Sequence, residues 1–188
     1  MSGLPVPGVP VFYAGQPPTA QLNAMSNAFS FLLSKVAFRA RRAATGAVTK
    51  GGHTLVPWDT VDEDPYTGWA AGSPTIYTVQ AGGWYLCVGT VSLGSAAAAG
   101  TVLIPAFCIN GLSQTGQPAA GPGWEGPELF IPTGAGDPKC VAGYWEGYCN
   151  ASDQISLDVF LSGEPAANLT WATAAGTQSR IEILWTGV

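Results

Sequence analysis

Charged residues are scarce in this sequence. They make up 10% of its 188 residues, with 7 Lys or Arg and 12 Asp or Glu, against about 25% in a typical soluble domain. A subunit that exists alone in water normally keeps a well-charged surface, so we expect copies of the chain to cover part of this one. Long apolar runs are also missing, since stretches such as Ala96–Ala99 are far shorter than the roughly 20 residues that span a bilayer. No membrane partner is expected.

Signatures of catalysis and of metal binding are missing as well. The sequence has one histidine, His53, and contains no GxSxG, HExxH, GxGxxG or P-loop pattern. Because no partner for a metal site or a triad accompanies it in sequence, we interpret His53 as a surface-turn residue. The four cysteines form no CxxC motif, so free buried thiols are expected, and a disulfide between Cys140 and Cys149 is left open. We predict a non-enzymatic protein without a cofactor.

What the sequence does contain, at its start, is proline and then a heptad pattern. Five prolines exclude a helix within residues 1–18 and predict an extended arm, whose apolar side chains, Val9 and Phe12 among them, lie on another surface. Residues 19–42 are predicted to form a helix and a basic linker. Apolar residues at alternating spacings of three and four mark a helical seam: Leu22, Met25, Phe29, Leu32 and Val36. The seam packs either against symmetry mates or on its own domain.

The basic residues are concentrated near this linker. Five of the seven lie between Lys35 and Lys50, and the first acidic residue is Asp59. We expect the linker arginines to contact an acidic neighbour or to lie in solvent: Arg39, Arg41 and Arg42. Nucleic-acid binding is not favoured, because few aromatic residues are interleaved with the basic ones.

From residue 43 onward the sequence has the pattern of β-strands. Short segments rich in Val, Ile, Thr, Tyr and Trp recur between Gly/Pro clusters, and eight of them are predicted as strands: 54–58, 75–80, 83–93, 101–110, 127–131, 140–149, 154–162 and 180–187. Eight strands without an intervening helix predict an all-β fold. The expected architecture is an antiparallel jelly-roll sandwich over residues 43–188, preceded by the short extended arm and helix.

Two stretches of this β region are candidates for contacts. Residues 83–124 carry no charge, so the surface between copies is predicted there, with Val102, Ile104 and Phe107 as its members. Asp62 and Asp64, close to Asp59, form an acidic loop that either holds Ca²⁺ or, as we favour, lies in solvent. Three tryptophans either stack on sugars or, as we favour, pack in a core or an interface: Trp124, Trp145 and Trp171.

Several short segments resemble the C1q/TNF-like jelly-roll family. They are Asp64–Gly68 followed by Trp69, then Thr75–Val79, Ala81–Tyr85, Asn150–Leu157 and the closing Ser179–Gly187. The resemblance covers about residues 45–188, although the final strand is more aliphatic than in that family. It implies a jelly roll that assembles around a threefold axis. Some members of the family also hold calcium.

A second resemblance concerns the amino-terminal segment. Phe12–Gln16, Thr19–Asn23 and Phe31–Leu33 are similar to the opening of minor structural proteins from tailed phages of actinobacteria. Together the two resemblances imply a bacteriophage virion protein, assembled in the host cytoplasm as a homotrimeric projection and attached by its arm to other virion proteins. A minor tail protein facing the host is the first interpretation. A capsid decoration protein and a carbohydrate-binding head that contacts a host-surface glycan are the alternatives.

Overall fold

The computed structural model describes residues 22–23, 25–26, 35–49, 51–94, 101–113, 129–130, 139–162 and 169–187. Short helical stretches occur at 22–23 and 25–26, and the other regular elements are strands. In chain order these are β1 (Val36–Arg42), β2 (Ala47–Val48), β3 (Gly52–Leu55), β4 (Thr60–Glu63), β5 (Tyr77–Thr78), β6 (Gly83–Leu93), β7 (Val102–Ile109), β8 (Leu112–Ser113), β9 (Leu129–Phe130), β10 (Lys139–Cys149), β11 (Gln154–Ser162), β12 (Leu169–Thr170) and β13 (Ser179–Gly187). No helix among the described residues is long and apolar enough to cross a membrane.

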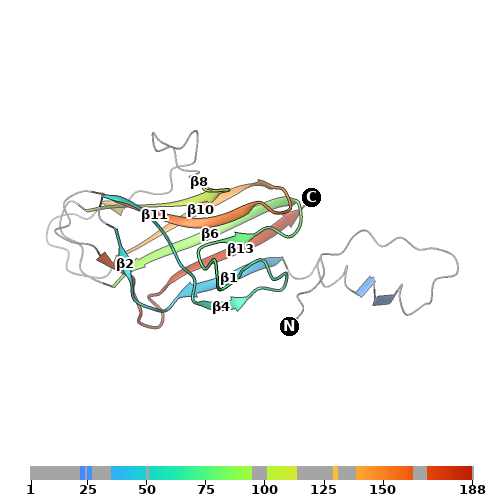
Figure 1. Ribbon diagram of the computed structural model, residues 1–188, viewed down its shortest axis with the longest axis horizontal. Helices are drawn as coiled ribbons and strands as arrows, with labels where there is room; N and C mark the ends of the chain where they lie inside the picture. Colours follow the sequence, from blue (N-terminus) through green and yellow to red (C-terminus); the bar gives the residue numbers. More distant parts are fainter. Residues whose placement is uncertain are drawn as a thin grey trace.

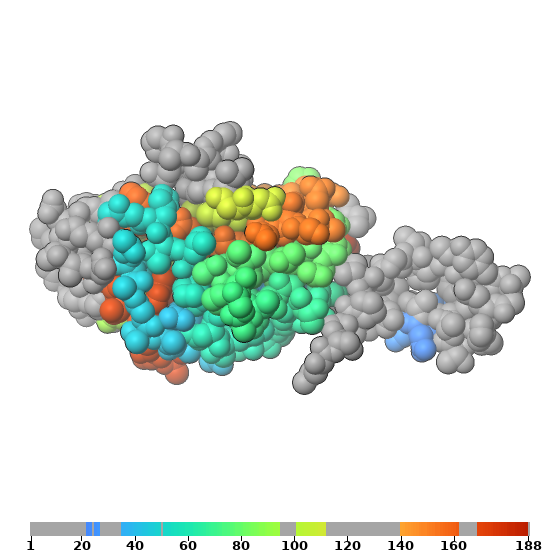
Figure 2. Space-filling view, in the orientation of Figure 1, coloured from blue at the N-terminus to red at the C-terminus, as the bar shows by residue number. Residues whose placement is uncertain are grey.

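The strands form two main antiparallel sheets. The first has the order β10-β6-β13-β1-β4, and the second has the order β3-β11-β7-β8, with β5 added to β11 and β9 to β7. A small ribbon of β12 and β2 accompanies them. Figure 1 shows the long strands running along the length of the body, and in Figure 2 the segment from β2 to β5, cyan to green, covers one side of it. The predicted all-β antiparallel sandwich is confirmed.

The core lies between the two sheets and follows from the alternation of side chains along each strand. On β11, Ile155, Leu157, Val159 and Leu161 are all fully buried, as the sequence pattern predicts. Phe38 on β1 and Ile183 on β13 meet them from the first sheet as members of the same core cluster. Burial of one such side chain contributes about 1.5–3 kcal/mol, so the sandwich is held mainly by these facing rows.

Gly89 on β6 allows the two sheets to approach closely. A Cβ atom at this position would lie 2.6 Å from Leu157 Cδ2 and 3.2 Å from the Phe107 ring, both on the second sheet. A side chain there would push the sheets apart, so glycine fixes the thickness of the sandwich at its middle.

The sandwich begins earlier in the chain than predicted. Residues 36–42, expected in the helix and basic linker, form β1, which pairs with β13 on one side and with β4 on the other. The predicted seam cannot be one continuous helix, because Val36 belongs to this strand. Leu22 and Met25 are exposed within the short helical stretches, while Val9, Phe12, Phe29 and Leu32 lie outside the described residues. Pairing within the sheet buries Ala37, Phe38 and Ala40.

Candidate functional site

An apolar patch lies on the outer face of the first sheet. Trp84, Val88, Tyr144 and Tyr148 are 48%, 40%, 63% and 53% exposed, and we call these four residues the aromatic patch. The antiparallel register places Tyr148 opposite Trp84 and Tyr144 opposite Val88. The Trp84 and Tyr148 rings meet edge to face with centroids 6.2 Å apart. Their strand neighbours point into the core, so the patch is fixed by the same alternation that builds the sandwich.

The aromatic patch was missed in the sequence, although β6 carried a signal for it. Trp84, Leu86 and Val88 are apolar on one face, while Tyr85 and Cys87 fill the core on the other. A strand that is apolar on both faces is typical of one that is covered on both sides. β6 belongs to the uncharged stretch 83–124, whereas the predicted interface residues lie in the later part of that stretch, on β7.

The linker arginines lie on β1, which β13 separates from the strands of the aromatic patch, and they pair within the chain. Arg39 contacts Glu63 on β4 at 2.8 Å and Glu182 on β13. Arg41 Nε lies 3.2 Å from Asp62, and Arg42 Nη1 donates to Asp59 at 2.7 Å. The acidic neighbour expected for these arginines is therefore largely β4 and its flank in the same chain. Exposed pairs of this kind contribute about 0–1 kcal/mol each, so they neutralise this part of the face more than they stabilise it.

The acidic loop is used for local structure. Asp64 accepts hydrogen bonds from the Gly68 amide at 3.0 Å and the Trp69 amide at 3.1 Å. Burial raises the pKa of Asp64, and these amides act against that rise. Asp62 is engaged by Arg41 instead. The described residues contain no group of three or more His, Cys, Asp or Glu side chains that converge as metal ligands.

Asp59 ties the β1–β2 loop to the end of β1. Its Oδ1 accepts from the Ala43 amide at 2.8 Å, and its Oδ2 accepts from the Ala44 amide at 2.9 Å as well as from Arg42. Burial alone would raise the pKa of Asp59, but these hydrogen bonds, with one from Thr60, hold it below its ordinary value.

A histidine–aspartate pair lies on the second sheet. His53 on β3 contacts Asp158 on β11 through Nδ1, and its ring lies 4.8 Å from the Phe160 ring. The side chain of Asp158 is 4% exposed and that of His53 is 44% exposed. Burial raises the pKa of Asp158, and the contact with His53 opposes that rise. The pair joins β3 to β11, and among the described residues no hydroxyl or thiol is hydrogen-bonded to His53.

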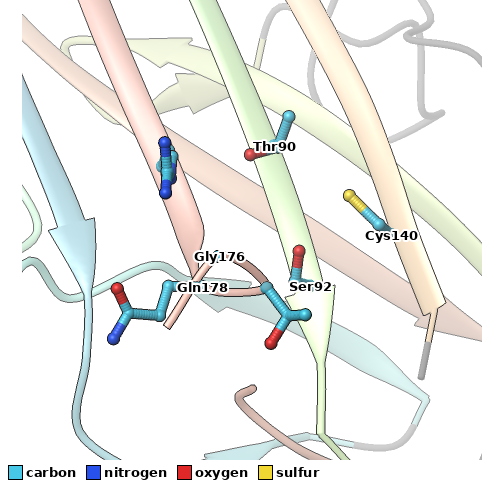
Figure 3. Close-up of a pocket in the computed structure, with 7 residues that line it drawn as sticks. Thr90, Ser92, Cys140, Gly176 and Gln178 are labelled. Atoms are coloured by element: carbon cyan, nitrogen blue, oxygen red, sulfur yellow. The ribbon is translucent and has the colours of Figure 1, made fainter. Parts of the chain in front are cut away.

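Several hollows border the outer face of the first sheet among the described residues, one of them of about 240 Å³ between Val88 and Arg180. Of two larger ones, the first, of about 280 Å³, lies beside the aromatic patch and is lined by Trp84, Tyr144, Trp145 and Glu146. The second, of about 350 Å³, lies farther along the strands, and its described lining residues are Thr90, Ser92, Cys140, Gly176, Thr177, Gln178 and Arg180. Figure 3 shows Thr90 and Ser92 on β6, and Cys140 on β10, bordering this second hollow together with Gly176 and Gln178 of the loop before β13.

Comparison with known proteins was informative for structure only. No protein-family model matches the chain, and no curated protein matches it in sequence. The globular domain of zebrafish complement 1qA protein superimposes with a TM-score of 0.51 at 12% identity, covering 80% of this chain and 97% of that one. The fold is a C1q/TNF-like jelly roll. Murine APRIL, at a TM-score of 0.47 and 13% identity, covers 79% of this chain and 98% of its own. The Eiger TNF of S. frugiperda superimposes with a TM-score of 0.49 at 9% identity, covering 82% of this chain and 94% of that one.

Within the C1q/TNF-like jelly roll, the residues predicted for the subunit interface lie on the second sheet. Phe107 is 3% exposed and belongs to the core cluster, Ile104 is 9% exposed, and Val102 is half-buried. Phe107 therefore packs within one chain. An uncharged strand is also what burial inside a sandwich requires, so the absence of charge does not by itself distinguish a core strand from an interface strand. For Val102 and Ile104 the interface stays a prediction.

The remaining aromatic and cysteine predictions concern the same jelly roll. Trp145 and Trp171 are 8% and 2% exposed, which matches the favoured packing interpretation, and Trp124 lies outside the described residues. None of the four cysteines forms a disulfide, and Cys140 alone is exposed. Cys140 and Cys149 occupy the two ends of the extended strand β10, which is too great a separation for a disulfide.

Proposed function

We propose that this C1q/TNF-like head is a non-enzymatic structural module that forms a homotrimer through the outer face of its first sheet. We further propose that the trimer projects from a bacteriophage virion, as a minor tail protein that faces the host. The aromatic patch carries the first part of the proposal. The resemblance of the amino-terminal segment to phage structural proteins supports the second part.

The size of the face suits an interface between subunits. Five strands about 4.8 Å apart and up to 11 residues long, at about 3.3 Å per residue, span at most roughly 850 Å². Each partner in a standard protein interface buries about 800 Å². Large apolar side chains gathered on one face of that size favour contact with another protein surface over exposure to water.

The charges on the same face favour a second copy as the partner. Arg39 is already paired with Glu63 and Glu182, and Arg41 with Asp62, so this region presents little net charge. Two copies can then approach without strong repulsion. Among the described strands β10 is paired on one side only, so its other edge offers 11 residues of backbone that an adjoining subunit would cover.

The oligomeric state tests the proposed interface. Val88→Asp places a charge in the aromatic patch, whereas Leu55→Asp places one on β3 of the other sheet, and both native side chains are 40% exposed. Native mass spectrometry of the full chain should give trimers for the wild type and Leu55→Asp, and monomers for Val88→Asp. A monomeric wild type, or a trimeric Val88→Asp, contradicts the proposal.

Attachment to a particle tests the virion role. A truncation should stop before Lys35, because β1 begins at Val36 and a longer deletion would remove part of a central strand. The chain lacking residues 1–34 should remain a folded trimer that no longer enters particles. Copy number then separates the two virion roles, since a few trimers indicate a tail protein and hundreds indicate capsid decoration. Incorporation of the truncated chain contradicts attachment through the arm.

A carbohydrate-binding head is the second candidate, and the hollow at the aromatic patch favours it. Trp84 and Tyr144 offer aromatic faces for stacking on a sugar, and Glu146 offers a carboxylate to accept from sugar hydroxyls. Glycan-array binding by the full chain, lost in Trp84→Ala while the trimer persists, would support this function. An array without binding leaves assembly as the function of the patch.

A further inference from the structure

Arg180 differs from the other arginines of the chain. All four arginines are among the described residues, and Arg39, Arg41 and Arg42 each form an ion pair. Arg180 is exposed on β13 and forms no ion pair with any described residue. In a chain with a net charge of −5, a guanidinium left without a carboxylate is a notable exception.

The surroundings of Arg180 add to its uncompensated charge. The β1–β13 register places Arg41 directly opposite Arg180, and like charges in that relation destabilise a sheet. Asp62 and Glu182 border a smaller hollow beside Arg180, but Asp62 is paired with Arg41 and Glu182 with Arg39. An anion bound at Arg180 would reduce the repulsion between Arg180 and Arg41, which the existing ion pairs do not remove.

The 350 Å³ hollow has the lining that such an anion requires. None of its described lining residues is acidic, and hydroxyls of Thr90, Ser92 and Thr177 accompany Arg180. The guanidinium presents a planar fork of donors that matches a carboxylate or a phosphate. Hydroxyl groups beside it suit the neutral polar part of a small organic molecule.

We propose that this hollow is a binding site for a small organic oxyanion, a carboxylate- or phosphate-bearing molecule up to the size of a monosaccharide. The site borders the aromatic patch, because Val88 and Thr90 are two residues apart on β6 and line one smaller hollow together with Arg180. It lies on the same outer face as the proposed trimer interface, but the inference rests on Arg180 and the hollow and not on the trimer.

Cys140 provides a reporter inside the site. It is the one exposed thiol of the chain and lines the hollow with Arg180, and in Figure 3 its sulfur points from β10 towards β6. Iodoacetate and iodoacetamide both alkylate a thiol: sulfur bonds to the CH₂ carbon, iodide leaves and the thiol proton passes to solvent. Only iodoacetate carries a carboxylate for Arg180. The ratio of the two rates cancels any change in the reactivity of the thiol itself.

The test compares these rates on the full-length chain. In Arg180→Gln the iodoacetate-to-iodoacetamide ratio should fall about fivefold, the effect of one close charge pair in water, and Arg180→Lys should fall between Arg180→Gln and the wild type. Lys35→Gln removes an exposed cation outside the hollow and should leave the ratio unchanged. Glucuronate and inorganic phosphate should slow iodoacetate labelling of the wild type, whereas glucose should not. Stronger competition by glucuronate assigns the site to organic carboxylates, and stronger competition by phosphate assigns it to phosphates.

Three results would overturn the proposal. An unchanged ratio in Arg180→Gln shows that the guanidinium does not bind the reagent. Equal slowing by chloride at matched ionic strength shows only diffuse charge attraction. The third result combines two observations: Arg180→Gln loses trimers in native mass spectrometry, and added anions do not compete with labelling. Arg180 then pairs with a carboxylate of a second copy.

Discussion

Removing the imidazole of His53 should reveal how strongly the buried Asp158 carboxylate depends on it. The Asp158 side chain is 4% exposed, and its Oδ1 has no hydrogen-bond partner among the described residues. Loss of one partner from a buried charge pair costs about 3–5 kcal/mol. His53 is itself 44% exposed, and water enters when it is truncated, so we expect His53→Ala to lower the free energy of unfolding by about 2 kcal/mol.

Asp158→Asn is the matched variant, because it keeps the shape of the side chain and removes the buried charge. We expect it to change the free energy of unfolding by less than about 1 kcal/mol, and the double variant to be more stable than His53→Ala alone. Urea unfolding of the four proteins gives these values directly. A His53→Ala variant as stable as the wild type, or an Asp158→Asn variant as unstable as His53→Ala, would contradict this dependence.

The stability of the same variants should depend on pH, and the direction of the change follows from the pKa of Asp158. Burial raises the pKa of Asp158 in the folded state, and removal of His53 removes an interaction that opposes the rise. Between the ordinary value, about 3.9, and the raised one, the folded chain binds a proton that the unfolded chain does not. His53→Ala should therefore gain stability relative to the double variant as the pH falls from about 7 towards about 4.

Three further predictions concern other parts of the head. Gly68→Ala should destabilise the chain by about 2–4 kcal/mol in urea unfolding, because a Cβ would lie 2.3 Å from the Tyr77 ring. Asp59→Ala should cost about 1–2 kcal/mol at neutral pH; since the pKa of Asp59 is lowered on folding, this cost should disappear as the pH falls below about 3.9. Native thiol titration should detect Cys140 alone and denaturation should reveal the buried cysteines, whereas more than one fast-reacting native thiol would contradict the packing.

Local alternation made much of the sandwich predictable. The segments 83–93 and 154–162 coincide with β6 and β11, because their core-facing rows repeat with a period of two. β10 and β13 each begin one residue before the predicted segment. β4 was not predicted, because the largely polar and acidic segment Thr60–Glu63 is typical of a loop. Its pairing with the arginine-bearing strand β1 is not visible in the local sequence.

Nonlocal pairing explains what the sequence could not reveal. The heptad spacing up to Val36 favoured a helix, whereas β1 is stabilised by β13, which follows it by more than a hundred residues. His53 looked isolated because its partner Asp158 is 105 positions away. Arg180 is far from the basic cluster in sequence, and the strand register shows that it lies opposite Arg41. In each case the two partners are more than a hundred residues apart in sequence, so a local sequence pattern cannot contain both of them.

The position of β1 has a mechanical consequence. The Lys35 carbonyl accepts from the Trp185 amide at 2.8 Å, and the strand that follows is paired on both sides, at six positions with β13 and at three with β4. Tension applied through the chain ahead of Lys35 would enter the sheet at an interior strand, next to the end of β13 (Figure 1). Two ladders share that load. Detaching β1 would therefore require both to fail, whereas a head suspended from an edge strand would need to lose only one.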